Sequence, residues 1–211
     1  MKIRTVELVE VHLRLRERFE ISTGGWQDRR ILLLRMASED GEAWSECVAA
    51  EAPNYSYETP DTAWHILTDY VLPAVVGREA DSPQELLAPV DWVRGHPMAR
   101  AAVEMGAWAL EAVRREESLA SLLGGSRTAV PVGVSVGLQG SDRELLRKVE
   151  EQLEAGYRKI KLKIKPGRDV EMLGMVRRRF PDAPLMADAN SSYTLEDVSR
   201  LQELDDLGLM M

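Results

Sequence analysis

The sequence predicts a mixed α+β part followed by βα units of a parallel sheet. Two observations lead to this prediction. Strand-like segments precede any helical pattern over residues 1–50, and strand-like and helix-like segments alternate after Thr128. Strands that precede helices are typical of an antiparallel sheet with helices on one face, whereas regular alternation is typical of parallel βα units.

The first part begins with predicted strands at 2–16 and 31–36, where apolar residues recur between polar or glycine-containing segments. They are expected to pair as a hairpin. Between them, residues 19–26 combine adjacent glycines, small hydroxyl residues and two aromatics, a composition that predicts a mobile, lid-like loop. A turn at Gly41 is predicted to lead into a further strand that ends near Cys47.

A helical pattern starts at Pro60, where Thr59 can cap the helix and proline suits the first turn. The later segments with helical spacing of apolar residues are 83–93, 98–115 and the short 119–125.

The second part alternates strands and helices. The predicted strands are 130–138, 158–164 and 185–188, and the predicted helices are 141–155, 169–180 and 195–204. An apolar run at 206–211 predicts the beginning of a fourth strand.

Composition narrows the class of function. The chain has 27 Lys and Arg against 35 Asp and Glu, a net charge of −8, which disfavours a general nucleic-acid or anionic-membrane surface. The first residues lack the apolar core of a signal peptide and no later stretch could cross a bilayer, so a cytoplasmic protein is expected. The single cysteine, Cys47, cannot form an internal disulfide and is expected to be a small buried residue.

The most unusual segment is 159–165, in which lysines alternate with Ile160, Leu162 and Ile164. Successive side chains of a strand point to opposite faces, so the lysines share one face. Lys161 and Lys163 would lie roughly 6.6 Å apart along the strand, near enough for each cation to disfavour protonation of the other and make one a better base. The alternative is an amphipathic edge strand with its lysines in water.

A second polar group follows the strand at 185–188. Asp188 and Asn190 share a side-chain direction if the extended geometry persists, and their oxygens suit a hard cation such as Mg²⁺. A turn or a helix cap would explain the same residues.

Together, Lys161-x-Lys163, Lys165-Pro166-Gly167 and Asp188-x-Asn190 resemble the enolase superfamily. The resemblance is to the muconate-cycloisomerase-like branch, nearest to the family of o-succinylbenzoate synthase and N-acylamino acid racemase. It extends over the whole chain through segments 19–24, 41–47, 96–105, 122–125, 132–137, 159–167 and 188–193. Ser45 and Ala109 depart from the family pattern, in which a glycine and an aspartate are expected.

The resemblance implies an α+β capping domain at 1–125, followed at 126–211 by the beginning of a (β/α) TIM-type barrel that is incomplete in this chain. The remaining metal ligands and second catalytic lysine of the family would lie beyond Met211.

By the same resemblance, Lys163 is the acid/base and Lys161 helps to bind the substrate carboxylate. Asp188 is a ligand of Mg²⁺ or another divalent cation such as Mn²⁺. The substrate-binding residues would be Ser135, Asn190, Phe19 and Tyr55. Phe19 and Tyr55 are equally well explained as ordinary loop aromatics.

The implied activity is metal-dependent removal of the proton α to a carboxylate, by a lyase (o-succinylbenzoate synthase), an isomerase (N-acylamino acid racemase) or both. The partner is a small-molecule carboxylate, with no nucleic acid or membrane, and a homo-oligomer is consistent with the resemblance. The alternative is an inactive truncated fragment, or a binding protein that keeps the architecture. A lysine face that only binds anions would bind carboxylates without metal dependence.

Overall fold

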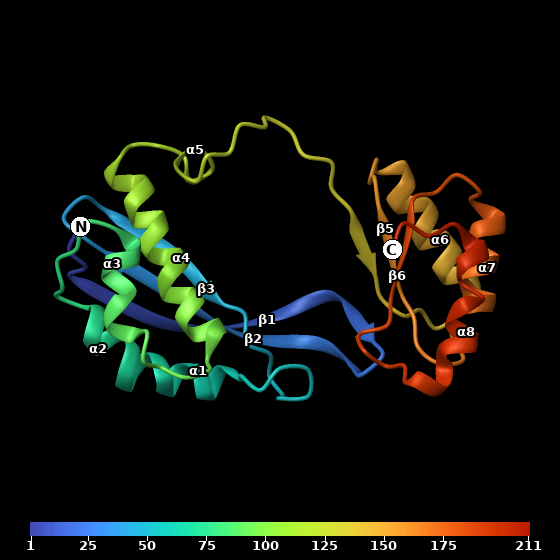
Figure 1. Cartoon of the computed structure of the whole chain (residues 1–211), viewed down its shortest axis with the longest axis horizontal. Coiled ribbons are helices and arrows are strands. Elements are labelled where there is room, and N and C mark those ends of the chain that lie inside the picture. The colour runs from blue at the N-terminus through green and yellow to red at the C-terminus, as the bar shows by residue number, and fades with distance from the viewer. The chain divides into compact units, whose positions relative to one another are not determined.

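The computed structural model describes all residues 1–211 and divides into two compact units (Figure 1). The first unit comprises residues 1–14 and 28–127, and the second comprises 15–27 and 128–211. The second unit therefore includes the end of the N-terminal hairpin. The domain boundary at 125/126 remains a proposal.

The sheet of the first unit has the order β1-β2-β3. The strands are β1 (Thr5–Ile21), β2 (Gly24–Ala37) and β3 (Glu42–Cys47), and β2 and β3 pair antiparallel from Leu32↔Cys47 to Ala37↔Glu42. The predicted hairpin and third strand are confirmed.

The prediction of a mobile loop at 19–26 is wrong. The two strands continue through this segment, and only Ser22 and Thr23 lie between them. The glycines serve close approach of the strands, because a Cβ on Gly25 would lie 3.1 Å from the carbonyl oxygen of Phe19. Two hydrogen bonds hold the end of the hairpin within the second unit: the Leu138 N–H donates to the Glu20 carbonyl (3.0 Å), and Ser22 Oγ donates to the Ala189 carbonyl (2.7 Å).

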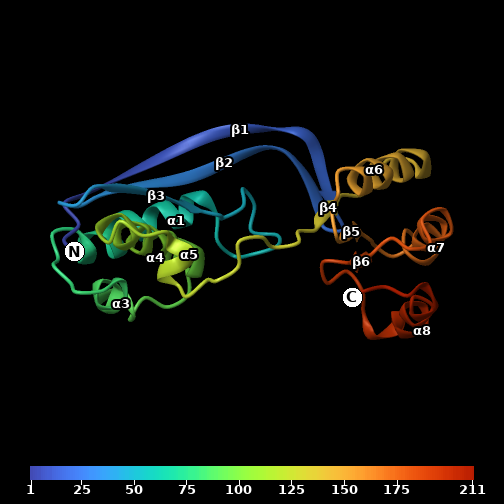
Figure 2. The same cartoon turned by 90° about the horizontal axis from the view of Figure 1, so that it is seen from above.

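The helices of the first unit lie on one side of its sheet (Figure 2). Thr59 caps the first helix, as predicted, and the N–H of Thr62 donates to its side chain. A π-helical turn at Leu67–Val71 then continues that helix into the next. The elements are α1 (Pro60–Ile66), α2 (Leu72–Val75), α3 (Pro83–Leu87) with a 3₁₀ turn at Ala88–Val90, α4 (Pro97–Arg114) and α5 (Leu119–Leu122).

Helix α4 packs closely on the sheet at Gly106. A Cβ at this position would lie 2.1 Å from Met36 Sδ and 3.1 Å from Ser45 Oγ, so a larger residue would displace the buried side chain of Met36. Ser45, one of the two departures from the family pattern, lies beneath this contact, and its buried hydroxyl has no hydrogen-bond partner. Ala109 packs against the edge of the same core. Both departures thus lie where helix and sheet pack.

The side chain of Glu58 caps the N-terminus of α4. The N-cap residue His96 has a left-handed backbone (φ 50°) and provides no side-chain cap. The fully buried carboxylate of Glu58 instead accepts hydrogen bonds from the N–H groups of Met98 (2.8 Å) and Ala99 (3.0 Å). It thereby satisfies two of the backbone donors that a helix leaves free at its first turn, where negative charge is also favourable.

The sheet of the second unit is parallel, with the order β4-β5-β6. Its strands are β4 (Val134–Val136), β5 (Ile160–Lys163) and β6 (Leu185–Asp188). Strand β4 is shorter than predicted, whereas β6 has the predicted bounds. The helices are α6 (Asp142–Glu154), α7 (Val170–Arg179) and α8 (Val198–Gln202), with 3₁₀ turns at Leu195–Asp197 and Asp205–Leu207. This is the predicted beginning of a βα barrel.

The fourth strand predicted at 206–211 does not form. Asp205–Leu207 is a 3₁₀ turn, and Gly208 then takes a left-handed conformation (φ 57°), which interrupts an extended run. Two backbone hydrogen bonds still join the last residues to β6: the Met210 N–H donates to the Leu185 carbonyl (2.8 Å) and the Ala187 N–H donates to the Met211 carbonyl (3.0 Å). The segment therefore lies beside β6 without a regular ladder.

Asp169 caps α7 and is almost fully buried. Its carboxylate accepts hydrogen bonds from the Val170 N–H (2.7 Å), the Tyr193 hydroxyl (2.8 Å) and Arg200 Nη2 (2.7 Å). Burial raises the pKa of Asp169, but the hydrogen bonds from Arg200, Tyr193 and Val170 together outweigh it, and the pKa lies below its ordinary value.

This lowered pKa predicts acid sensitivity of the second unit. An Asp with a depressed folded-state pKa stabilises the fold fully above its unfolded pKa, about 3.9, and loses that contribution as pH falls through the folded value. We expect Asp169→Asn to flatten the loss of stability below about pH 4. Urea titrations at several pH values, followed by NMR signals of Ile160 and Leu173, would measure it. Exposed Asp182→Asn is the control, and an equal effect of both variants would contradict the prediction.

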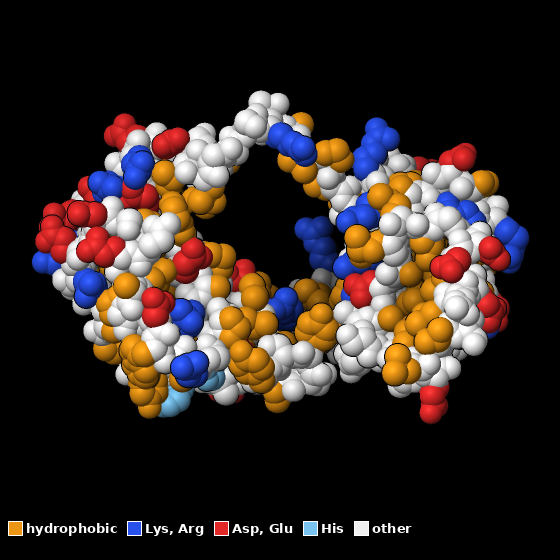
Figure 3. Space-filling view, in the orientation of Figure 1, with side chains coloured by type: hydrophobic (Ala, Val, Ile, Leu, Met, Phe, Trp, Pro, Cys, Tyr) orange, Lys and Arg blue, Asp and Glu red, His pale blue; other side chains and the backbone are white.

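On the face in Figure 3, Lys and Arg side chains lie among Asp and Glu side chains without a continuous basic area. None of the helices combines the length and the apolar character that crossing a membrane requires. Cys47 is a free, buried thiol, as predicted, and burial raises its pKa.

Candidate active site on the lysine strand

The lysine strand has the two faces that its alternation predicts. Ile160, Leu162 and Ile164 are at most 2% exposed and belong to the core formed with α6 and α7. On the opposite face, the side chain of Lys163 is 6% exposed and that of Lys161 is 29% exposed. The lysines therefore do not lie in bulk water, and the alternative of a solvated edge strand is wrong.

The two lysines meet at the carboxylate of Asp188. Lys163 Nζ lies 2.8 Å and Lys161 Nζ 3.0 Å from the same oxygen, Oδ2. The parallel register explains this arrangement, because Lys163 is the direct neighbour of Asp188 in the β5–β6 ladder. Lys163 also donates to Asn190 Oδ1 at 2.6 Å. Lys161, Lys163, Asp188 and Asn190 thus form one contiguous polar cluster.

The charge state of this cluster follows from its contacts. Partial burial raises the pKa of Asp188, but hydrogen bonds from Lys163, Lys161 and the Asn190 N–H more than compensate and lower it to about 2. Asp188 is therefore ionised at neutral pH. A lysine ammonium has three N–H donors, and Lys163 uses two of them on Asp188 and Asn190. One donor of Lys163 remains for another group.

Ser135 lies on the same face of the sheet. It is the ladder partner of Lys161 across β4 and β5, and its side chain is exposed. Ser135 and Phe19 both line a cavity of about 380 Å³ between the end of the hairpin and β4. A Cβ on Gly137 would lie 3.0 Å from the Glu20 carbonyl oxygen and 3.4 Å from Phe19 Cδ2, so glycine lets the hairpin approach.

Tyr55 lies in the other unit. It belongs to the irregular segment after β3, and it is 63% exposed. Its role in substrate binding remains a proposal.

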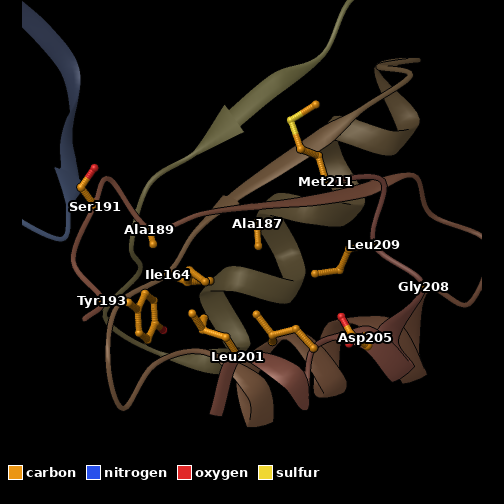
Figure 4. A pocket seen from close by; sticks show the side chains of 11 residues that line it. Ile164, Ala187, Ala189, Ser191, Tyr193, Leu201, Asp205, Gly208, Leu209 and Met211 are labelled. Atoms are coloured by element: carbon orange, nitrogen blue, oxygen red, sulfur yellow. The ribbon is translucent and has the colours of Figure 1, made fainter. Parts of the chain in front are cut away.

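A larger cavity, about 640 Å³, lies on the opposite, helix-facing side of the sheet (Figure 4). Ala187 of β6, together with Ile164 and Ala189 just after β5 and β6, points into it opposite Tyr193 and Leu201. These three residues alternate along the chain with Lys163 and Asp188, so this cavity lies on the other side of the sheet from the polar cluster.

The carboxylate of Asp188 and the amide oxygen of Asn190 are suitable ligands for Mg²⁺, but they are too few to form a complete site. Asp188 accepts three hydrogen bonds, two at Oδ2 and one at Oδ1. A carboxylate has about four acceptor positions, so about one remains for a metal ion. No group of three or more His, Cys, Asp or Glu side chains is placed to hold a metal ion. Because Mg²⁺ prefers six oxygens in octahedral geometry, residues 1–211 supply at most one carboxylate ligand of such a site.

Several residues around the cluster were not predicted. Ser22 and Glu20 join the hairpin to the residues that follow β6 and β4. The Tyr193 hydroxyl joins the turn after β6 to Asp169. The only local signal was the hydroxyl and polar composition of 19–23 and 188–193, which by itself predicts a loop.

Two family models match the chain. The model described as mandelate racemase / muconate lactonizing enzyme, N-terminal domain, matches residues 3–124, and the enolase C-terminal domain-like model matches residues 144–211.

Similar proteins agree with these models. The chain is 46% identical to an N-succinylamino acid racemase of Thermus thermophilus over 99% of its length, and 42% identical to an o-succinylbenzoate synthase of Geobacillus stearothermophilus over its full length. A solved enolase-superfamily protein from Listeria innocua is 34% identical, with a TM-score of 0.91 over 99% of the chain. The chain spans 57%, 56% and 57% of the length of these three proteins.

Proposed function

This chain belongs to the mandelate racemase / muconate lactonizing enzyme family of the enolase superfamily, and from that premise we propose that it supplies the acid/base half of a site that removes the proton α to a carboxylate. The observation that carries the proposal is the buried amine of Lys163, held between Asp188 and Asn190 beside the second cation of Lys161. The activity is proposed for a form extended to the full length of the relatives.

In this proposal Lys163 exchanges the α-proton with the substrate at Nζ. The hydrogen bonds to Asp188 and Asn190 fix the position of this nitrogen, and position is a large part of acid/base catalysis. Lys161, which is more exposed, would bind the substrate carboxylate through its charge. Ser135, the ladder neighbour of Lys161, and Phe19 would contribute to substrate binding.

A divalent cation, Mg²⁺ or Mn²⁺, with Asp188 as one of its ligands, would bind the substrate carboxylate and stabilise the negative charge that develops as the α-proton leaves. The relatives named above suggest N-succinylamino acids and the precursor of o-succinylbenzoate as substrates. Reprotonation on the opposite face would racemise an N-succinylamino acid, and loss of water from the precursor would yield o-succinylbenzoate. A cytoplasmic location and a homo-oligomer are part of the same proposal.

The test is α-proton exchange of an N-succinylamino acid in D₂O, followed by ¹H NMR. We expect exchange by the extended form with Mg²⁺ and its loss with a chelator. The 211-residue chain should not catalyse exchange, because one carboxylate cannot hold Mg²⁺ in place. Metal-dependent exchange by the 211-residue chain would contradict the assignment. Carboxylate binding by the extended form without any exchange would favour an anion-binding protein instead.

A further inference from the structure

The turn that carries Asn190 has an unusual backbone. Asn190 (φ 49°) and Ser191 (φ 59°) are consecutive non-glycine residues in the left-handed region. Asparagine tolerates this region, but serine does so less readily, and two such residues in succession are uncommon. The turn closes through a hydrogen bond from the Ser192 N–H to the Ala189 carbonyl (3.2 Å). Such a conformation persists only where surrounding contacts hold it.

Contacts at the first end of the turn come from the polar cluster. The Asn190 N–H donates to Asp188 Oδ1 (3.0 Å), and its side-chain oxygen accepts from Lys163 (2.6 Å). Ser22 Oγ donates to the carbonyl of Ala189. These contacts depend on the turn conformation, because they use both the backbone and the side chain of Asn190.

Tyr193 provides the contact at the other end. Its hydroxyl donates to Asp169 Oδ2 at 2.8 Å, and its ring packs against the core of the second unit. Asp169 cannot easily move, since it is 1% exposed and its Oδ1 is held by Val170 and Arg200. Burial, together with the hydrogen bond to Asp169, raises the pKa of Tyr193, so the phenol stays protonated and remains a donor.

We propose that Tyr193 is a positioning residue, whose hydrogen bond to Asp169 holds the 189–193 turn in the conformation that presents Asn190 to Lys163 and Asp188. The effect passes through the backbone, because Tyr193 lies three residues after Asn190 and contacts neither lysine. The inference rests on the proposed function only in treating Asn190 and Lys163 as site residues.

The test is amide hydrogen exchange of the 211-residue chain, measured residue by residue by NMR. Tyr193→Phe removes the hydroxyl and keeps the ring, so the core should still pack. We expect the Asn190 amide to exchange roughly tenfold faster, the effect of losing one hydrogen bond to a charged group. The Ile160 amide, which donates to the Pro184 carbonyl at the far end of β5, should keep its rate. Tyr157→Phe is the matched control, because Tyr157 packs against the same core and should leave both rates unchanged.

The outcomes are distinguishable. An unchanged Asn190 rate in Tyr193→Phe would overturn the proposal, and so would equal acceleration at Asn190 and Ile160, since the phenol would then stabilise the whole unit. Faster amide exchange at Asn190 alone would support the positioning role of Tyr193. This result is independent of α-proton exchange by an extended form, whose absence would contradict only the proposed function. If the extended form is active, Tyr193→Phe should lower kcat more than it changes KM, because it displaces the turn around the acid/base.

Discussion

Lys163→Ala, in a form extended to the length of the relatives, is expected to lower α-proton exchange of an N-succinylamino acid by roughly a hundredfold to ten-thousandfold. This is the usual contribution of a positioned general acid or base, and alanine cannot transfer a proton. The loss should concern the face of the substrate that Lys163 serves. Deuterium incorporation from each enantiomer, followed by ¹H NMR, would measure it.

Two further variants make the result specific. Lys165→Ala is the matched control, because Lys165 belongs to the same alternating series but is 40% exposed and lies 3.9 Å from Glu20 instead of at Asp188. It should retain nearly full activity. Lys161→Ala should raise KM as well as lower kcat, since this lysine is proposed to bind the carboxylate. Undiminished exchange in Lys163→Ala would show that another group transfers the proton.

The two faces of the lysine strand could be predicted from sequence because they depend on strand periodicity. Alternation in a strand is a local rule, so the opposite faces of Lys163 and Leu162 followed directly from residue spacing. The pairing of Lys163 with Asp188 follows from parallel register, which brings strand ends together. Where the pattern was regular, as in β6, even the predicted bounds agree with the structure.

The wrong predictions concern segments whose amino-acid composition is compatible with more than one structure. Gly25 suggested mobility, but it instead allows two strands to approach closely. The apolar run after Asp206 suggested a strand, but Gly208 interrupts it. Tertiary contacts that select between such explanations come from residues distant in sequence, and they leave no periodic pattern.

Contacts between residues distant in sequence also explain why the roles of the Asp169 and Glu58 carboxylates were not predicted. Asp169 and Tyr193 are separated by 24 residues, and Glu58 lies 40 residues before Met98. Nothing in the neighbourhood of Glu58 predicts that its carboxylate is buried, since acidic residues are seldom fully buried unless paired. Its partners are backbone N–H groups that α4 presents only after the helix has docked.

Glu58→Ala is therefore expected to destabilise the first unit by about 3 kcal/mol. The substitution leaves the buried N–H groups of Met98 and Ala99 without partners, at a cost of about 1 to 3 kcal/mol each, and it removes a negative charge from the helix N-terminus. Glu58→Gln retains one acceptor oxygen, so its effect should be smaller, about 1 kcal/mol.

Urea unfolding followed by tryptophan fluorescence would test this expectation selectively. Of the five tryptophans, Trp26 lies in the second unit, whereas the others, Trp44, Trp64, Trp92 and Trp108, report on the first. The urea midpoint should fall in the order wild type, Glu58→Gln, Glu58→Ala. Exposed Glu117→Ala, which removes an equal charge from the same unit, should leave the midpoint nearly unchanged. If Glu117→Ala lowered the midpoint as much as Glu58→Ala, net charge would explain the effect, and the carboxylate of Glu58 would not be what secures the start of α4.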